Sequence, residues 1–231
     1  MTTSLAPSTG ATVLPAPRDA RVAWCETTAG LGAINRPGVT MAIWRRSLPL
    51  CLGGWIGRLD PTTLPDLRIL VRPTDLRRAL LPFLADVGGA GRPMRDLLVG
   101  DVDTLVRTFS DIAGCDHVDV RLERITDDAC WKFHRDSVDV RLLTTYRGPA
   151  TEWVTPGYAE QALREQKGYA GPIERLQAHD VAVFKGRNGD PQDGIVHRSP
   201  AIADQGIVRW LLCLNKPTRV SPAPWSADVP R

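Results

Sequence analysis

The strongest constraint on the fold is a change of pattern at Cys115, after which short segments of alternating or apolar residues follow one another. Residues 118–125 alternate with a period of two, as expected for a strand with one buried face. Further short segments, separated by turn-forming Gly, Pro, Asn and Asp, lie at residues 138–146, 151–154, 177–186, 195–197 and 207–215. Many short strands with turns between them are typical of a β-sandwich or a jelly-roll barrel.

The preceding residues, 19–114, are predicted to be mainly helical, with one early strand at 38–46. The segments expected to be helical are residues 20–33, 63–71, 76–82 and 95–113. The last of these is the clearest, because its apolar residues recur at helical spacing up to Gly114. We expect these helices to pack on the outside of the β region, which makes the protein a member of the α+β class.

The two ends of the chain differ from the rest in composition. Residues 1–18 are rich in Thr, Ser, Ala, Pro and Gly, and residues 217–231 are rich in Pro and Ser. Such segments bury little apolar surface. A flexible N-terminal tail and an irregular C-terminal tail are therefore expected on either side of the folded part.

Composition excludes several classes of protein. The net charge is +3, and the Lys and Arg residues are scattered, so there is no nucleic-acid footprint. The five Cys residues are odd in number and include no Cys-x-x-Cys, which argues against a disulfide scaffold and a structural zinc ribbon. No secretory leader begins the sequence, and no apolar run is long enough to cross a bilayer. We therefore expect a cytoplasmic protein with reduced thiols and no membrane partner.

The residues with the clearest chemical potential are His134 and Asp136, two positions apart within residues 131–146. Side chains at i and i+2 of a strand point to the same face, so an imidazole and a carboxylate are expected side by side. His197, in a later strand, supplies a second imidazole. Two His and one carboxylate form the facial triad of non-haem Fe(II) oxygenases. These three residues are therefore the predicted metal ligands and catalytic residues.

An ordered set of residues resembles the Fe(II)/2-oxoglutarate-dependent dioxygenases. The set consists of His134-x-Asp136, the strand that runs from Asp180 to Gly186, then His197 and finally Arg209. The resemblance covers roughly residues 118–215 and implies a double-stranded β-helix core at 115–216, with Fe(II) and 2-oxoglutarate as cofactor and co-substrate. It departs from the family at His179, where a Gly usually precedes the Asp.

The same resemblance implies roles for four other residues. Arg209 is the expected partner of the distal carboxylate of 2-oxoglutarate, because a planar guanidinium matches a carboxylate. Arg141 and Arg198 are weaker candidates for that role or for binding an acidic substrate, and Tyr146 is a candidate hydrogen-bond donor to the co-substrate. The implied activity is hydroxylation of a small molecule or other substrate that no motif identifies.

The whole sequence also resembles an uncharacterised bacterial family known only as a domain of unknown function. Members of that family are associated with zinc-responsive gene neighbourhoods, which implies a second function, a non-catalytic zinc-binding protein of zinc homeostasis with the same His and Asp ligands. Zinc accepts both thiolate and imidazole, so Cys115, His117 and His179 are candidate fourth ligands in this interpretation.

Each of these features also has a purely structural interpretation. His134 and Asp136 can contact each other on an exposed strand face, with the Asp orienting the His. His197 can be a hydrogen-bonded turn residue, and Arg209 can form an ion pair at a sheet edge. Neither a Gly-x-Ser-x-Gly elbow nor a Gly-rich phosphate loop is present, which argues against a serine hydrolase and a nucleotide-binding enzyme.

Overall fold

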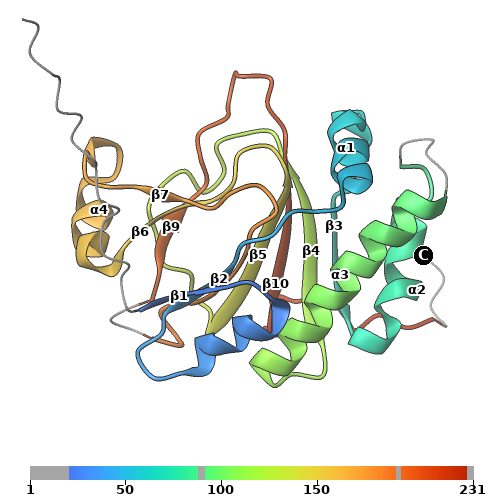
Figure 1. The fold of residues 1–231 in the computed structure, drawn as a ribbon, viewed down its shortest axis with the longest axis horizontal. Coiled ribbons are helices and arrows are strands. Elements are labelled where there is room, and N and C mark those ends of the chain that lie inside the picture. The colour runs from blue at the N-terminus through green and yellow to red at the C-terminus, as the bar shows by residue number, and fades with distance from the viewer. Residues whose placement is uncertain (1–20, 88–91, 191–193, 228–231) are drawn as a thin grey trace, which may run out of the picture.

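The architecture is built on two β-sheets (Figure 1). A computed structural model describes residues 21–87, 92–190 and 194–227 of the protein. The larger sheet has seven strands in the order β1-β2-β8-β5-β10-β4-β3, and the smaller has three in the order β7-β6-β9. All neighbouring pairs are antiparallel except β1 and β2. The strands are β1 (Val22–Cys25), β2 (Met41–Trp44), β3 (Leu67–Val71), β4 (Val118–Ile125), β5 (Val140–Arg147), β6 (Glu152–Val154), β7 (Glu174–Arg175), β8 (Val181–Lys185), β9 (Val196–Arg198) and β10 (Arg209–Asn215).

Helices cover one face of the larger sheet (Figure 1). The α-helices are α1 (Leu50–Arg58), α2 (Leu76–Leu80), α3 (Arg92–Ala113) and α4 (Ala159–Glu165). The 3-10 helices are Thr28–Asn35, Pro61–Thr63, Pro73–Asp75, Leu81–Leu84, Pro156–Tyr158 and Gln166–Gly168. Within the described stretches, no helix is both long and apolar enough to cross a membrane.

The main core lies between the larger sheet and α1, α2 and α3. Helix α3 contributes a stripe at helical spacing that includes Leu98, Val102, Leu105 and Phe109, all buried. The strands contribute every second residue to this core, for example Trp210, Leu212 and Leu214 of β10, because successive side chains of a strand point to opposite faces. The other alternate set therefore faces away from the helices.

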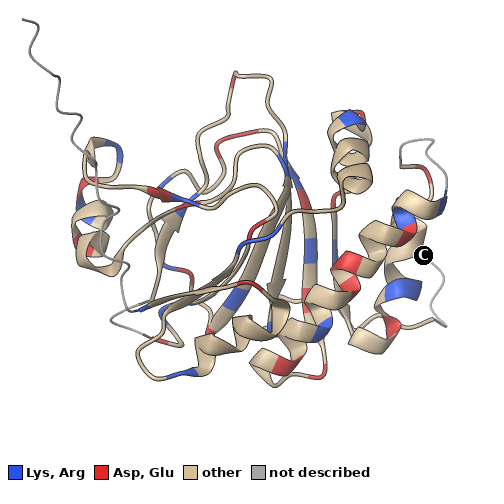
Figure 2. Cartoon of the chain, viewed as in Figure 1, with Lys and Arg blue, Asp and Glu red and all other residues tan. Residues whose placement is uncertain are grey.

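On that opposite face, the two sheets enclose a second apolar cluster. Ile43, Leu143 and Phe184 of the larger sheet pack there against Trp153 of β6 and Ile195 before β9. The smaller sheet covers only part of the larger one, as Figure 1 shows, and α4 packs on its outer side. Acidic and basic residues are interspersed over the whole fold (Figure 2). The described strands form two separate sheets and do not join into one closed barrel.

Most of the predicted β segments are confirmed. Strands overlap the predicted segments 38–46, 118–125, 138–146, 151–154, 177–186, 195–197 and 207–215, although β5 and β9 each end one residue later than predicted. Helix α3 covers the predicted helix at 95–113. The predicted α+β class is also confirmed. Gly114 follows α3 with φ +59°, the left-handed conformation that ends helices.

Other predictions for residues 19–114 are wrong in detail. Residues 63–71 are not a helix, because β3 occupies Leu67–Val71 and pairs with β4. Residues 20–33 divide into β1 and a 3-10 helix, and α1 was not predicted. A short apolar segment fits both the helical and the strand period, so pairing with a neighbouring strand decides which of the two forms. As a result, this part of the sequence supplies three strands to the same sheet as residues 115–216.

The predicted tail at residues 1–18 lies outside the described residues. The C-terminal segment, described up to residue 227, has no helix or named strand of its own but follows the sheet edge. Pro224 forms a bridge with Leu70 of β3, and Trp225 N donates to Leu70 O at 2.7 Å. This segment thus covers backbone groups at one end of the larger sheet.

Truncation of Leu105, which is fully buried in α3, tests the importance of the helical face. We expect Leu105→Ala to lower the free energy of unfolding by about 2–5 kcal/mol, through lost burial and the cavity left behind. Leu50→Ala is the matched control, because Leu50 is 95% exposed and its truncation should change stability by about 0.5 kcal/mol or less. Urea denaturation measures both, and equal effects would contradict the packing described.

Candidate metal centre

His134 and His197 are paired through the backbone, although they are far apart in sequence. Their peptide groups exchange two hydrogen bonds of 3.0 Å each and form an isolated antiparallel bridge beside β9. Directly opposed residues of antiparallel strands carry their side chains on the same face. The imidazole rings accordingly lie with centroids 4.5 Å apart. Phe184 of the larger sheet packs against His197, with ring centroids 4.8 Å apart.

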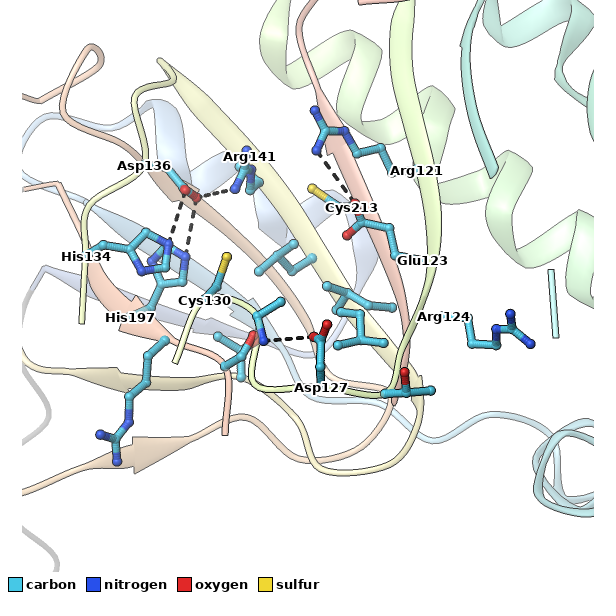
Figure 3. Close-up of a pocket in the computed structure, with 18 of the residues that line it drawn as sticks. Arg121, Glu123, Arg124, Asp127, Cys130, His134, Asp136, Arg141, His197 and Cys213 are labelled. Atoms are coloured by element: carbon cyan, nitrogen blue, oxygen red, sulfur yellow. Dashed lines mark hydrogen bonds and ion pairs between the residues drawn. The ribbon is translucent and has the colours of Figure 1, made fainter. Parts of the chain in front are cut away.

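Asp136 lies in a loop, which corrects the prediction that it shares a strand face with His134. The turn after β8 holds this loop, since Arg187 N donates to Asp136 O at 2.9 Å. Gly186 permits the close approach, because a Cβ there would lie 2.5 Å from the carbonyl oxygens of Asp136 and Val138. Loop and turn together direct the Asp136 carboxylate toward the two imidazoles (Figure 3).

The three side chains converge on one small volume. His134 Nε2 lies 3.5 Å from Asp136 Oδ1, and His197 Nε2 lies 3.4 Å from Asp136 Oδ2. One ligand atom from each residue lies within 4.8 Å of the others. Two imidazole nitrogens and one carboxylate oxygen at such separations form a donor set suited to a divalent transition metal. The residues present therefore fit a metal ion of the predicted kind.

The opposite nitrogen of each imidazole faces a backbone carbonyl. His134 Nδ1 lies 2.8 Å from Lys132 O, and His197 Nδ1 lies 3.4 Å from Ile195 O. With Nδ1–H donating to the carbonyl, the lone pair of the neutral ring is on Nε2, toward Asp136. A backbone carbonyl that orients the ring in this way is the usual support for a metal-binding His.

Asp136 is a buried carboxylate that stays charged. Burial alone raises its pKa, but the contacts with the His134 and His197 rings and the charge of Arg141 outweigh burial and hold the pKa far below its ordinary value. Arg141 Nη1 lies 2.5 Å from Asp136 Oδ2, and Arg141 Nε donates to Asn215 Oδ1 at 2.7 Å. Arg141 therefore anchors the carboxylate from the side of the larger sheet.

Arg209 is a fully buried guanidinium with neutral partners. It donates to Pro149 O at 2.8 Å, to Ser199 Oγ at 2.7 Å and to Thr151 Oγ1 at 3.4 Å. Burial lowers the pKa of Arg209 to about 10, so it remains positively charged at neutral pH. No acidic side chain among the described residues forms a salt bridge with it, unlike the partly buried Arg46 and Arg141, which pair with Asp101 and Asp136. The predicted ion pair at a sheet edge is not observed for Arg209.

Two predicted co-substrate residues are engaged elsewhere. Tyr146 is buried on the helix-covered face, where its hydroxyl donates to Asp101 Oδ2 of α3 at 2.6 Å. Arg141 and Tyr146 differ by five positions along β5, so they face opposite sides. Arg198 follows His197 directly and points away from it, and it donates to Glu152 Oε2 at 2.7 Å. Its charge is thus already balanced by Glu152, but Arg198 lines the same cavity as His134 and His197, so its role stays a prediction. Tyr146 lies on the other face of the sheet, away from the cluster.

The candidate fourth ligands for zinc are not part of the cluster. Within the described part of the sequence, His134, Asp136 and His197 form the one group of three or more potential ligands, and neither Cys115, His117 nor His179 belongs to it. His179 adopts φ +73°, the left-handed conformation that a Gly favours at this turn. The turn before Asp180 is therefore kept in spite of the His.

The cluster opens onto a cavity of about 370 Å³ between the sheets and the loop at residues 126–130 (Figure 3). Ser199 and Thr151, the hydroxyl partners of Arg209, line it, and so does Arg141. The cavity is also lined by six residues that the sequence did not identify as site residues of an oxygenase: Arg121 and Glu123 of β4, Leu143, Leu211, Cys213 and Cys130. For the residues of β4 and β10, side-chain alternation places them at the cavity only when the pairing of the two strands is known.

A family model described as "Protein of unknown function (DUF1826)" matches residues 26–215, so the chain belongs to this family. This confirms the resemblance to a family of unknown function. No curated protein matches the sequence.

Several solved structures are similar in fold. A dioxygenase for auxin oxidation from rice is 11% identical over 85% of this chain and 79% of its own, with a TM-score of 0.47. AviO1 from Streptomyces viridochromogenes is 16% identical over 87% of this chain and 99% of its own, with a TM-score of 0.39. A prolyl-4-hydroxylase from Pseudomonas putida is 16% identical over 75% of this chain and 95% of its own, with a TM-score of 0.34. Similarities this distant do not assign an activity, which has to come from the site itself.

Removal of a cluster residue tests metal binding directly. We expect wild-type protein to bind one Fe(II) or Co(II) per molecule, and His134→Ala to weaken binding by more than about 100-fold, because loss of a mere supporting residue already costs 10–100-fold. Anaerobic titration calorimetry measures the dissociation constants. His179→Ala is the matched control and should bind as wild type does. Equal binding by His134→Ala and wild type would contradict the assignment.

Proposed function

We propose that this protein is an Fe(II)- and 2-oxoglutarate-dependent oxygenase that hydroxylates a small molecule. The observation that carries the proposal is the convergence of His134, Asp136 and His197 at the wall of a cavity. Two imidazoles and one carboxylate on a single side of a cation leave part of its coordination sphere for other ligands. A closed structural zinc site would need a fourth protein ligand, which the described residues do not supply.

Bound iron would supply the oxidation chemistry, coupling decarboxylation of 2-oxoglutarate by O2 to hydroxylation of a C–H bond. The residues of the protein hold and orient the reactants. His134, Asp136 and His197 would hold the metal, with Arg141 keeping Asp136 in place.

Arg209 supports the choice of 2-oxoglutarate as co-substrate. A buried guanidinium without an acidic partner is costly, and a carboxylate from a ligand would compensate it. Ser199 and Thr151 both contact Arg209 and line the cavity, so they would present hydroxyl groups to the same carboxylate. In this proposal Arg209, Ser199 and Thr151 bind the distal carboxylate while the 2-oxo acid end lies at the metal.

The zinc-homeostasis alternative differs from the oxygenase in one measurable respect. A zinc-binding protein using the same three ligands would bind Zn(II) without consuming 2-oxoglutarate. Comparison of the two metals in the assay below therefore separates the alternatives.

Formation of succinate from 2-oxoglutarate tests the activity. Purified protein with Fe(II), ascorbate and O2 should form succinate without added substrate, and His134→Ala and His197→Ala should abolish it. Arg209→Gln should raise the KM for 2-oxoglutarate roughly 30-fold or more, since removing one partner of a buried charge pair costs about 2–5 kcal/mol. Tyr146→Phe, on the opposite face of the sheet, is the matched control and should keep the rate. Absence of succinate with Fe(II), together with tight binding of Zn(II), would contradict the oxygenase.

A further inference from the structure

The cavity contains a second polar feature besides the metal cluster, the pair Arg121 and Glu123 on β4. The two residues are two positions apart and point to the same face of the larger sheet, away from the helices. Arg121 Nη1 lies 3.6 Å from Glu123 Oε1, an ion pair without a hydrogen bond. Figure 3 shows both side chains on the opposite side of the cavity from the imidazoles.

This pair stands out because the neighbouring charges are already matched. Asp119, on the same face of β4, accepts hydrogen bonds from Arg68 Nε and Nη2 and from Ser221 Oγ. Asp136 is held by Arg141, and Glu152 by Arg198. Arg121 and Glu123, in contrast, make no hydrogen bond from their side chains to any described residue. Arg121 Nε is buried without a hydrogen-bond acceptor, since the nearest carboxylate oxygen, Asp119 Oδ1, is 3.9 Å away and already bonded to Arg68. A buried donor without an acceptor is unfavourable, so a ligand group that accepts this hydrogen bond would be stabilising.

The floor of the cavity between this pair and the metal cluster is apolar. Arg121 is opposite Cys213 of β10, and Cys213 is opposite Leu143 of β5, two residues beyond Arg141. Strand spacing and rise place the Cα atoms of Arg121 and Arg141 roughly 12 Å apart. Leu143, Leu211 and Cys213 line the surface between them. A ligand held at Arg121 would therefore extend an apolar group toward the cluster.

From these observations we infer that the substrate is an aliphatic amino acid, bound as a zwitterion and hydroxylated on its side chain. Arg121 binds the carboxylate, because a guanidinium matches a carboxylate with two parallel hydrogen bonds. Glu123 binds the ammonium group. The adjacent opposite charges of an amino acid thus fit the adjacent opposite charges of Arg121 and Glu123, and the aliphatic part lies over Leu143 and Leu211.

The inference rests on the proposed function, and hydroxylation of the amino acid needs no reactants other than O2 and 2-oxoglutarate. One O2 and one 2-oxoglutarate convert an aliphatic C–H bond of the amino acid into C–OH, with succinate and CO2 as the other products. O2 accepts four electrons, two from 2-oxoglutarate and two from the C–H bond. One oxygen atom enters the alcohol and the other enters succinate.

The test measures succinate formation with L-leucine, L-isoleucine, L-valine and L-norleucine, each added separately to the iron-loaded protein. At least one should raise the rate above the substrate-free rate. Two probes derived from L-leucine separate its charges: 3-methylbutylamine lacks the carboxylate and 4-methylpentanoate lacks the ammonium group. Neither should raise the rate. Stimulation by 4-methylpentanoate equal to that by L-leucine would overturn the role of Glu123.

Variants of the pair give the second arm of the test. Arg121→Gln should raise the KM for the stimulating amino acid roughly 30-fold, as expected for loss of one charged partner. Arg121→Lys keeps the charge without the fork and should restore part of the affinity. Arg107→Gln removes an exposed arginine of α3 and is the matched control. An unchanged KM in Arg121→Gln would overturn the inference.

The result also distinguishes failure of the inference from failure of the proposed function. Substrate-free succinate without any response to the four amino acids would overturn the inference alone. If no succinate forms at all, titration calorimetry of metal-free protein decides. Binding of an aliphatic amino acid that is lost in Arg121→Gln and kept in Arg107→Gln would support the zwitterion site, and absence of binding would overturn it.

Discussion

The site depends on the two backbone hydrogen bonds that His134 exchanges with His197. These bonds extend the smaller sheet by a single residue and bring together imidazoles that the sequence separates widely. Because opposed residues of an antiparallel pair share a face, the backbone alone fixes both rings toward the larger sheet. Gln166 supports the arrangement from outside, since its side-chain amide accepts from Phe133 N and donates to Phe133 O, next to His134.

The third ligand reaches the same place by a different principle. Asp136 is positioned by a loop that fits against Gly186, where any larger residue would collide with two carbonyl oxygens. Arg141 then fixes the carboxylate from β5 and compensates the cost of its burial. Backbone pairing thus orients the imidazoles, and tight loop packing with one ion pair orients the carboxylate. This division allows the cluster to form where the two sheets separate and leave a cavity.

The charges around the cavity form a consistent set. Asp136 and Glu152 each have an arginine partner, whereas Arg209 has only neutral oxygen partners. Arg121 has only loose contacts, 3.6 Å to Glu123 and 3.9 Å to Asp119, and no hydrogen bond to either. Arg121 and Glu123 line the cavity, and Arg209 lies behind its Ser199 and Thr151 wall. Unmatched polar groups at a cavity point to ligands that complete them. A carboxylate of the co-substrate would complete Arg209, and a zwitterionic group of the substrate would complete Arg121 and Glu123.

The sequence was most informative where a period persisted over many residues. The alternation of residues 118–125 and the helical spacing of residues 95–113 identified β4 and α3, and His134, Asp136 and His197 were identified as one group from their types and order. Residues 63–71 were misassigned, because a short apolar segment becomes a strand only through pairing, here with β4. The sequence did not show that Tyr146 faces the helices, because the side of the sheet that a residue faces depends on how the strands pack. Arg121 and Glu123 were overlooked because their place in the cavity depends on the pairing of β4 with β10.

The most direct test is anomalous diffraction at the iron absorption edge from crystals grown anaerobically with Fe(II). The predicted result is a single iron ion bonded to His134 Nε2, His197 Nε2 and an Asp136 oxygen, with non-protein ligands completing its coordination. An iron peak at another place in the protein, or a cluster in which a fourth protein side chain closes the coordination, would contradict the account.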